Sequence, residues 1–81
     1  MGYSGVAFSP DGRLLAAVAW RGVAEVWDLS TGKRMATIHG PPGNLWAVTF
    51  SPDSQRLAIG GGNGTRGEIR VIELAKYLKA P

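Results

Sequence analysis

Short apolar runs alternate with turn signals along the whole chain. The runs are rich in aliphatic, β-branched and aromatic residues, and Gly, Pro, Asn, Asp and Ser separate them. Turn signals at a spacing of roughly 8–12 residues are typical of an all-β architecture. The pattern predicts seven strands, at residues 5–9, 13–19, 23–28, 34–39, 45–50, 56–61 and 68–74. The runs at 14–19 and 45–50 are apolar at successive positions, which predicts strands packed between neighbouring sheets.

The pattern occurs twice. Residues 6–14 (VAFSPDGRL) return 42 positions later as residues 48–57 (VTFSPDSQRL). Later blocks of the two copies align at an offset of 45, so three additional residues lie in the glycine-rich stretch 61–67, which we interpret as a loop. Self-similarity with a period of about 40–45 residues is characteristic of propellers and solenoids.

A tight turn follows the first strand of each copy. In the first copy Pro10 sets its own φ angle, Asp11 can bond the backbone ahead of it, and Gly12 tolerates a positive φ. The second copy has Ser54 in place of Gly12. Because serine disfavours positive φ, we expect a different local geometry there.

The motifs FSPDG at 8–12, LLA at 14–16 and VWDLSTGK at 26–33 occur in an order and at distances that resemble the WD-repeat β-propeller family. Trp27-Asp28 corresponds to the dipeptide that names the family. The resemblance covers residues 5–74 and implies four-stranded antiparallel blades arranged radially around a channel. It implies one complete blade at residues 1–40, three strands of a second blade at 41–74, and a C-terminal tail at 75–81. The tail reads as short helix or frayed chain, although Tyr77 and Leu78 could pair at a sheet edge.

Most of the family's buried hydrogen-bond network is missing here. Trp27 is retained, but Ala19 and Arg21 stand where the family has Ser or Thr and Asp, and Ile72-Glu73 replaces Trp-Asp in the second copy. The blades are therefore expected to depend on apolar packing, with Asp11, Asp28 and Asp53 as further structural residues. The expected packing residues are Phe8, Leu14, Val26, Trp27, Val48, Phe50, Leu57, Ile59 and Val71. Truncating Trp27 to Ala is expected to cost about 3–5 kcal/mol.

The family's topology implies that the connections at 20–22, 39–45 and 62–67 gather on one face. Trp and Arg are enriched among interface hot spots, so this face is the candidate site for a protein or peptide partner. The candidate residues are Trp20, Arg21, His39, Pro42, Asn44, Trp46, Asn63 and Arg66. Contact with a partner and packing on a blade are both open for Trp20. Packing is favoured for Trp46, because alternation would place it with Val48 and Phe50.

Composition limits the remaining function classes. The chain has 81 residues, 44% of them hydrophobic, with no Cys and a net charge of +3, as in soluble globular proteins. Its basic residues are scattered, whereas a nucleic-acid footprint would cluster them, and it has no apolar run of about 18 residues for a membrane span. The absence of Cys does not fix a compartment; the cytoplasm is the expected one.

Candidate chemistry is sparse. His39 is the one histidine, without the serine and carboxylate spacing of a catalytic triad, and one His without Cys cannot fill a tetrahedral metal site. The glycines at 60–64 lack the Lys and helix of a phosphate loop. We expect no catalytic, metal or cofactor site, and a non-enzymatic protein.

Three hypotheses for function remain open. The first is a scaffold that binds a protein or peptide through its loop-rich face. The second is a two-blade subunit that closes a propeller with copies of itself, and the third is a regulatory or ligand-binding arm of a larger multidomain protein. Two blades leave open strand edges and an unpacked face, which further blades of the same chain or of other copies would cover. The missing outer strand favours a piece of a longer propeller.

Overall fold

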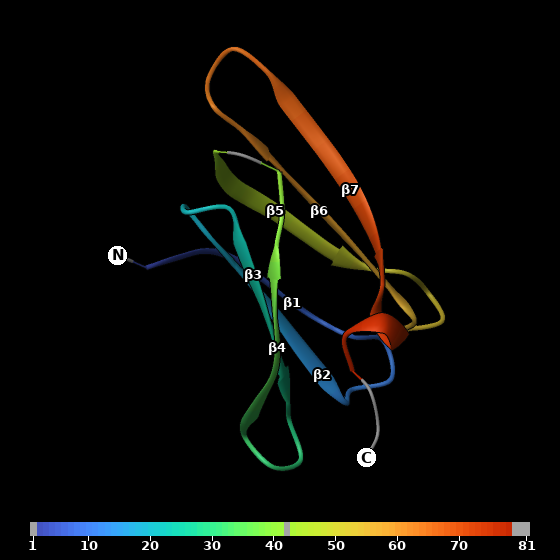
Figure 1. Ribbon diagram of the computed structural model, residues 1–81. Helices are drawn as coiled ribbons and strands as arrows, with labels where there is room; N and C mark the ends of the chain where they lie inside the picture. Colours follow the sequence, from blue (N-terminus) through green and yellow to red (C-terminus); the bar gives the residue numbers. More distant parts are fainter. Residues whose placement is uncertain (1, 42, 79–81) are drawn as a thin grey trace.

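Two antiparallel sheets make up the part of the chain that the computed structural model describes, residues 2–41 and 43–78 (Figure 1). The first sheet holds four strands in chain order: β1 (Tyr3–Phe8), β2 (Leu14–Ala19), β3 (Val23–Asp28) and β4 (Lys33–His39). The second sheet holds three: β5 (Asn44–Phe50), β6 (Arg56–Gly62) and β7 (Gly67–Glu73). The all-β class, with four strands of one blade and three of the next, is confirmed.

The strands begin and end close to the predicted positions, but the interpretation of one stretch of the sequence differs. Gly61 and Gly62 continue β6 and Gly67 begins β7, so the expectation that the whole stretch 61–67 is a loop was wrong. A Cβ atom on Gly61 would lie 2.7 Å from the Cα atom of Leu45 and would also collide with the carbonyl oxygen of Asn44. Glycine at this position permits two strands to approach closely. In the sequence, a glycine with this role cannot be distinguished from a glycine in a turn.

A 3-10 helix, η1 (Leu74–Lys76), follows β7. Leu74 is 3% exposed, and Leu78 packs against the same core. The Leu78 N–H donates to the Leu74 carbonyl oxygen at 2.8 Å, so this segment turns back instead of forming an edge strand. Of the predicted tail, residues 79–81 lie outside the described residues.

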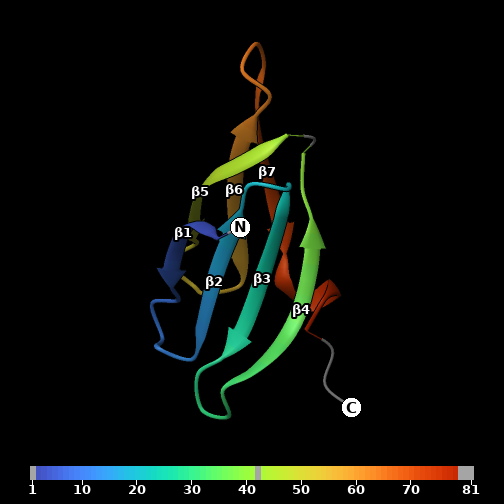
Figure 2. The same ribbon diagram turned by 90° about the vertical axis from the view of Figure 1, so that its left-hand side faces the viewer.

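The core lies between the two sheets, and β5 packs against β1 and β2 (Figure 2). The first sheet contributes mostly small side chains and the second larger ones. The buried residues of this core are Ala16, Val18, Ala24, Val26, Ile38, Leu45, Phe50, Leu57, Ile59, Ile72 and Leu74. Burying a Val, Leu, Ile or Phe side chain stabilises a fold by about 1.5–3 kcal/mol. The contact between the sheets is therefore the main source of stability.

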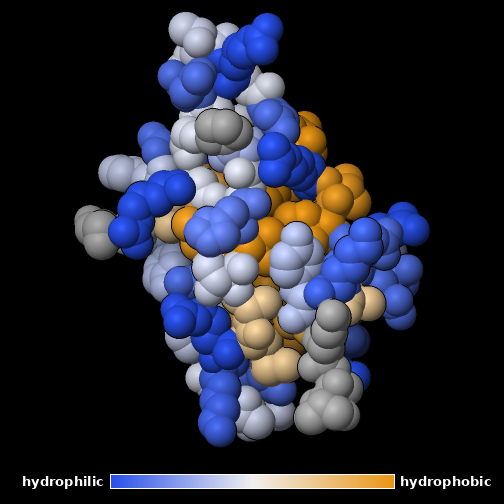
Figure 3. Space-filling model, in the orientation of Figure 1, coloured by the Kyte–Doolittle hydropathy of each residue, from blue (hydrophilic) through white to orange (hydrophobic). Residues whose placement is uncertain are grey.

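Two predicted packing residues are not buried in this chain. Phe8 is 67% exposed and Val71 is 65% exposed, because each lies on the face of its own sheet that points away from the other sheet. Figure 3 shows the resulting apolar area over β7. Residues 14–19 are largely buried as predicted, but within 45–50 only Leu45 and Phe50 are buried, so packing on both faces was wrong for that strand.

The two Ser-Pro-Asp turns have the same hydrogen bonds, in contrast to the expected difference. In the first turn, Asp11 Oδ1 accepts from Ser9 Oγ at 2.6 Å and from the Arg13 N–H at 3.0 Å. In the second, Asp53 Oδ1 accepts from Ser51 Oγ at 2.6 Å and from the Gln55 N–H at 3.0 Å. The turns are equivalent.

Ser54 adopts the conformation that was expected to require glycine. Its φ is 63°, beside 77° for Gly12. The Ser54 Oγ accepts a hydrogen bond from the Asp11 N–H at 3.2 Å, which joins the turns of the two sheets. This bond offsets part of the cost of a positive φ at a residue with a Cβ atom.

Candidate protein-interaction surface

Three connections pack together at one end of the molecule, which we call the loop end: β2–β3, β4–β5 and β6–β7 (Figure 2). The Gly40 N–H donates to the Gly22 carbonyl oxygen at 2.8 Å. A Cβ on Gly22 would lie 3.0 Å from the carbonyl oxygens of both Pro41 and Gly43. Gly22 and Gly43 have φ angles of 74° and 100°, so glycine supplies both the backbone conformation and the close approach.

The β6–β7 connection projects beyond the rest of the loop end (Figure 1). Asn63 Oδ1 accepts hydrogen bonds from the Thr65 N–H at 3.3 Å and from the Arg66 N–H at 3.2 Å. The Asn63 side chain therefore shapes its own loop. Arg66 is exposed on the same loop and remains accessible.

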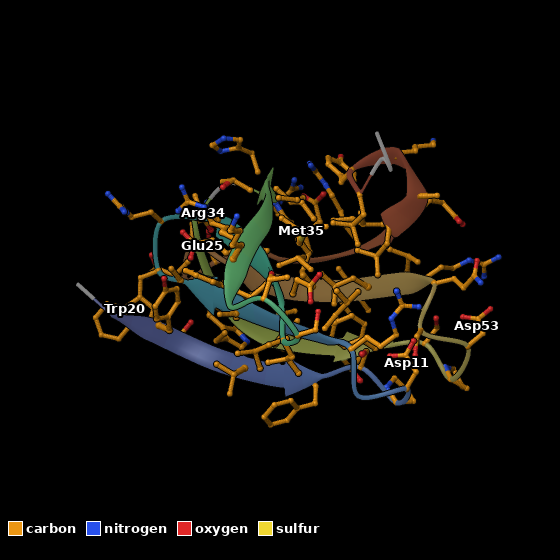
Figure 4. All side chains as sticks on the ribbon, turned by 90° about the horizontal axis from the view of Figure 1, so that it is seen from below. Asp11, Trp20, Glu25, Arg34, Met35 and Asp53 are labelled. Carbon is orange, nitrogen blue, oxygen red and sulfur yellow. The ribbon has the colours of Figure 1, made fainter. Side chains whose placement is uncertain are left out.

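Trp20 and Arg21 lie on the β2–β3 turn, and both are exposed, Trp20 at 62%. Together with Tyr3 and Glu25 they border a shallow hollow of about 380 Å³. Figure 4 shows Trp20 at the end of the molecule opposite Asp11 and Asp53. His39, the last residue of β4, is exposed near the same turn, since it pairs with Val23.

A polar row beside this hollow was missed in the sequence. The Tyr3 hydroxyl donates to Glu25 Oε1 at 2.6 Å, and Arg34 Nη1 donates to Glu25 Oε2 at 3.3 Å (Figure 4). The Glu25 carboxylate raises the pKa of the Tyr3 hydroxyl, because it accepts the proton of that bond and repels the phenolate. The pairing of the strands places these three residues on one face of the sheet. They could have been found from the sequence only by assigning which residues pair in each of the three hairpins.

Trp46 does not join the other candidate residues. A bulge between Leu45 and Ala47 gives Leu45 the inward position and leaves Trp46 56% exposed. Trp46 lines a separate hollow of about 420 Å³ with Ala47, Gly60 and Ile69. The expected packing of Trp46 beside Val48 and Phe50 was therefore wrong, since the bulge breaks the simple alternation.

Asn44 is exposed at the start of β5, and Pro42 lies outside the described residues. The Asp28 carboxylate accepts from the Ser30 Oγ at 2.7 Å and the Ser30 N–H at 2.8 Å, and these bonds lower the pKa of Asp28. Trp27 is partly buried and pairs with Leu15 and Arg34 on the neighbouring strands. The cost of Trp27→Ala stays a prediction.

Residues 2–41 and 43–78 contain neither a candidate metal-ion site nor a helix that could span a membrane. No three His, Cys, Asp or Glu side chains in these ranges are grouped so that they could hold a metal ion. No helix in the same part of the chain has the length and apolar character needed to cross a membrane.

Known proteins resemble this chain over most of its length. The family described as "WD domain, G-beta repeat" matches residues 3–28 and 32–65. The chain is 36% identical over 58 residues to "Eukaryotic translation initiation factor 3 subunit I" of Scheffersomyces stipitis, a match to 72% of the chain and 17% of that protein.

Two further relatives carry WD repeats in their names. The chain is 35% identical over 71 residues to "WD repeat-containing protein SL1-17" of Schistosoma mansoni, which covers 88% of the chain and 24% of that protein. It is 38% identical over 52 residues to an "Uncharacterized WD repeat-containing protein" of Deinococcus radiodurans, 64% of the chain and 20% of that protein. The chain thus spans between 17% and 24% of the length of these relatives.

Proposed function

Since the chain belongs to the WD domain, G-beta repeat family, we propose that it is a non-enzymatic scaffold that binds a protein or peptide at its loop end. The observation that carries the proposal is the exposure of Trp20 and Arg21 on a turn held by close backbone contacts. A turn fixed in this way loses little conformational entropy when a partner binds, so more of the contact energy appears as affinity.

The hollow beside Trp20 indicates the chemistry of the partner. Tyr3 and Trp20 supply aromatic walls, while Arg21 and the Glu25 carboxylate supply charge of both signs. An apolar or aromatic side chain would pack between the walls, and polar groups beside it would bond the charged side chains. An extended peptide segment with one large apolar anchor fits this arrangement.

The relatives named as a subunit of translation initiation factor 3 support a setting within a multi-protein assembly. As part of the same proposal, the protein acts in the cytoplasm. The partner in such an assembly would be another protein.

Selection of peptides from a displayed random library on the immobilised chain provides the probe. Binding of a selected, labelled peptide is then measured by fluorescence anisotropy. Trp20→Ala and Arg21→Ala are expected to weaken the Kd by at least about tenfold, in the range of interface hot spots, and Arg66→Ala by less. Trp46→Ala is the matched control, because Trp46 is similarly exposed but lines the other hollow. Selected peptides whose Kd is unchanged in all three loop-end variants, or changed equally in Trp46→Ala, would contradict the proposal.

A further inference from the structure

Asn63 is a candidate partner contact by sequence, but the structure uses its side chain within the β6–β7 connection itself. The Oδ1 atom accepts hydrogen bonds from the Thr65 N–H at 3.3 Å, the Thr65 hydroxyl at 3.2 Å and the Arg66 N–H at 3.2 Å. The Asn63 N–H donates to the Arg66 carbonyl oxygen at 3.2 Å. At the base of the connection, Gly62 pairs with Gly67. The Asn63 amide is thus held in a defined orientation on the projecting loop (Figure 1).

The backbone nitrogen of Gly64 follows directly after this amide and can attack its carbonyl carbon, Cγ. Attack would close a five-membered imide ring from atoms of the two residues. Gly64 is exposed, has a φ of 97°, and a Cβ atom there would have no heavy atom within 4 Å. Within residues 2–41 and 43–78, the Gly64 N–H donates no hydrogen bond. The nitrogen is therefore unshielded by a side chain, and its proton is open to solvent.

The three donors around Oδ1 act on the same reaction. As a nitrogen adds to Cγ, negative charge develops on Oδ1, and donors that already point at this oxygen stabilise the charge. The Thr65 N–H, the Thr65 hydroxyl and the Arg66 N–H occupy those positions before any reaction begins. The bonds that shape the loop therefore also activate the Asn63 amide.

Asn44, the other asparagine of the chain, has the opposite surroundings. It begins β5, where it pairs with Gly62, and the next residue is Leu45, whose side chain is fully buried. Ring closure at Asn44 would require its backbone to leave the sheet, and the branched side chain of Leu45 lies beside the attacking nitrogen. One molecule thus contains a reactive asparagine and a protected one for comparison.

The loop also has the hydrogen-bond donors that a carboxylate at this position would need. At the β3–β4 turn, the Asp28 carboxylate accepts from the N–H and the hydroxyl of Ser30, two residues ahead, at 2.8 Å and 2.7 Å. Asn63 accepts from the same two groups of Thr65, again two residues ahead. A charged oxygen accepts such bonds more strongly than an amide oxygen. An aspartate in place of Asn63 would therefore keep the loop and add a negative charge beside Arg66.

We propose that Asn63 is a self-modification site, at which the folded chain converts its own side-chain amide into a carboxylate. The Gly64 nitrogen bonds to Asn63 Cγ and gives up its proton, the Cγ–Nδ2 bond breaks, and ammonia leaves with that proton. Water then opens the imide: addition at Cγ gives aspartate, and addition at the main-chain carbonyl carbon gives isoaspartate. The net charge of +3 falls by one, at the loop end. The reaction needs no partner, so it stands apart from the proposed function.

Incubation of the folded 81-residue chain at neutral pH, followed by peptide mapping with mass spectrometry, measures this reaction. In water labelled with heavy oxygen, Asn63 should become a mixture of isoaspartate and aspartate that carries the label, while Asn44 stays intact. The mixture identifies the imide, because direct hydrolysis of the amide gives aspartate alone. Circular dichroism during the incubation checks that the chain stays folded.

Gly64→Ala tests the attacking group, since it leaves Asn63 in place and adds one methyl group beside the nitrogen. Conversion should slow by at least about tenfold, which corresponds to about 1.4 kcal/mol of barrier. Gly12→Ala is the matched control, because Gly12 also has a positive φ and no heavy atom within 4 Å of an added Cβ, and it should leave the rate unchanged.

Four results would overturn the proposal. In the first, Asn63 survives in the folded chain while a synthetic peptide of residues 61–67 converts, so that the loop protects the amide. In the second, aspartate forms without isoaspartate, which would indicate direct hydrolysis. In the third, Asn44 and Asn63 convert at equal rates, which would place the reaction in unfolded chains. In the fourth, Gly64→Ala reacts as fast as the unaltered chain.

Discussion

Phe8 and Phe50 occupy the same position in the two copies of the repeat, yet Phe8 is 67% exposed and Phe50 is 8% exposed. Both end the first strand of their sheet, and both pair with a leucine, Leu15 or Leu57. The first sheet lies over Phe50, whereas the equivalent face that holds Phe8 is open. The burial of a repeated residue thus depends on its neighbour in space.

The largest expected effect is the difference between these two phenylalanines. Phe50→Ala should lower the free energy of unfolding by about 3–4 kcal/mol, because it removes a buried aromatic side chain from the core. Phe8→Ala should change the free energy of unfolding by less than about 0.5 kcal/mol, as for other exposed positions. Urea unfolding at low protein concentration measures both, and equal losses would contradict the difference in burial.

The next effect concerns Gly61, whose equivalent position in the first sheet holds an alanine, Ala19. Gly61→Ala should cost about 1–3 kcal/mol, because the added Cβ atom collides with the backbone of β5. Gly2→Ala is the control, since a Cβ atom there would have no heavy atom within 4 Å. Thermal unfolding followed by circular dichroism compares the variants. A Gly61→Ala variant as stable as the control would show that β5 moves away without cost.

A smaller effect is expected at the two Ser-Pro-Asp turns. Gly12→Ser should cost about 1 kcal/mol, because its φ of 77° strains a residue with a Cβ atom. Ser54→Gly should change stability by less than about 0.5 kcal/mol, since relief of the same strain is offset by loss of the Asp11 hydrogen bond. Urea midpoints of the two variants check this asymmetry. A large gain from Ser54→Gly would mean that the bond between the turns contributes nothing.

The smallest expected effect is the pH dependence of the same turns. The hydroxyls of Ser9 and Ser51, helped by backbone N–H groups, hold the pKa of Asp11 and Asp53 below the ordinary value. A carboxyl with a lower pKa in the folded state adds stability above its unfolded pKa of about 4, and this stability is lost as the pH falls through the folded pKa. Urea midpoints should therefore decline below about pH 4. Asp11→Asn and Asp53→Asn should each flatten that decline by a similar amount. If only one of the two variants flattened it, the turns would not be equivalent.

Only part of the candidate surface could be predicted from the sequence. Loop signals and the family's topology brought together the connections that carry Trp20, Arg21 and Arg66. They did not separate Trp46 from this group, because a bulge depends on how two strands pair and has no simple sequence pattern. The Tyr3–Glu25–Arg34 row was missed for a related reason, since these residues are neighbours only across strands.

By itself, the sequence determined the seven strands, the two turns and the repeat that relates them, because alternating apolar runs and turn residues act over a few neighbouring positions. The tertiary structure decided which apolar residues are buried, since Phe8 and Phe50 carry the same local signals but face different surroundings. It also decided that Gly61 lies within a strand and that Ser54 adopts a positive φ, because β5 and the Asp11 backbone lie close to them. Local conformation follows from neighbours along the chain, whereas burial and close approach follow from neighbours in space.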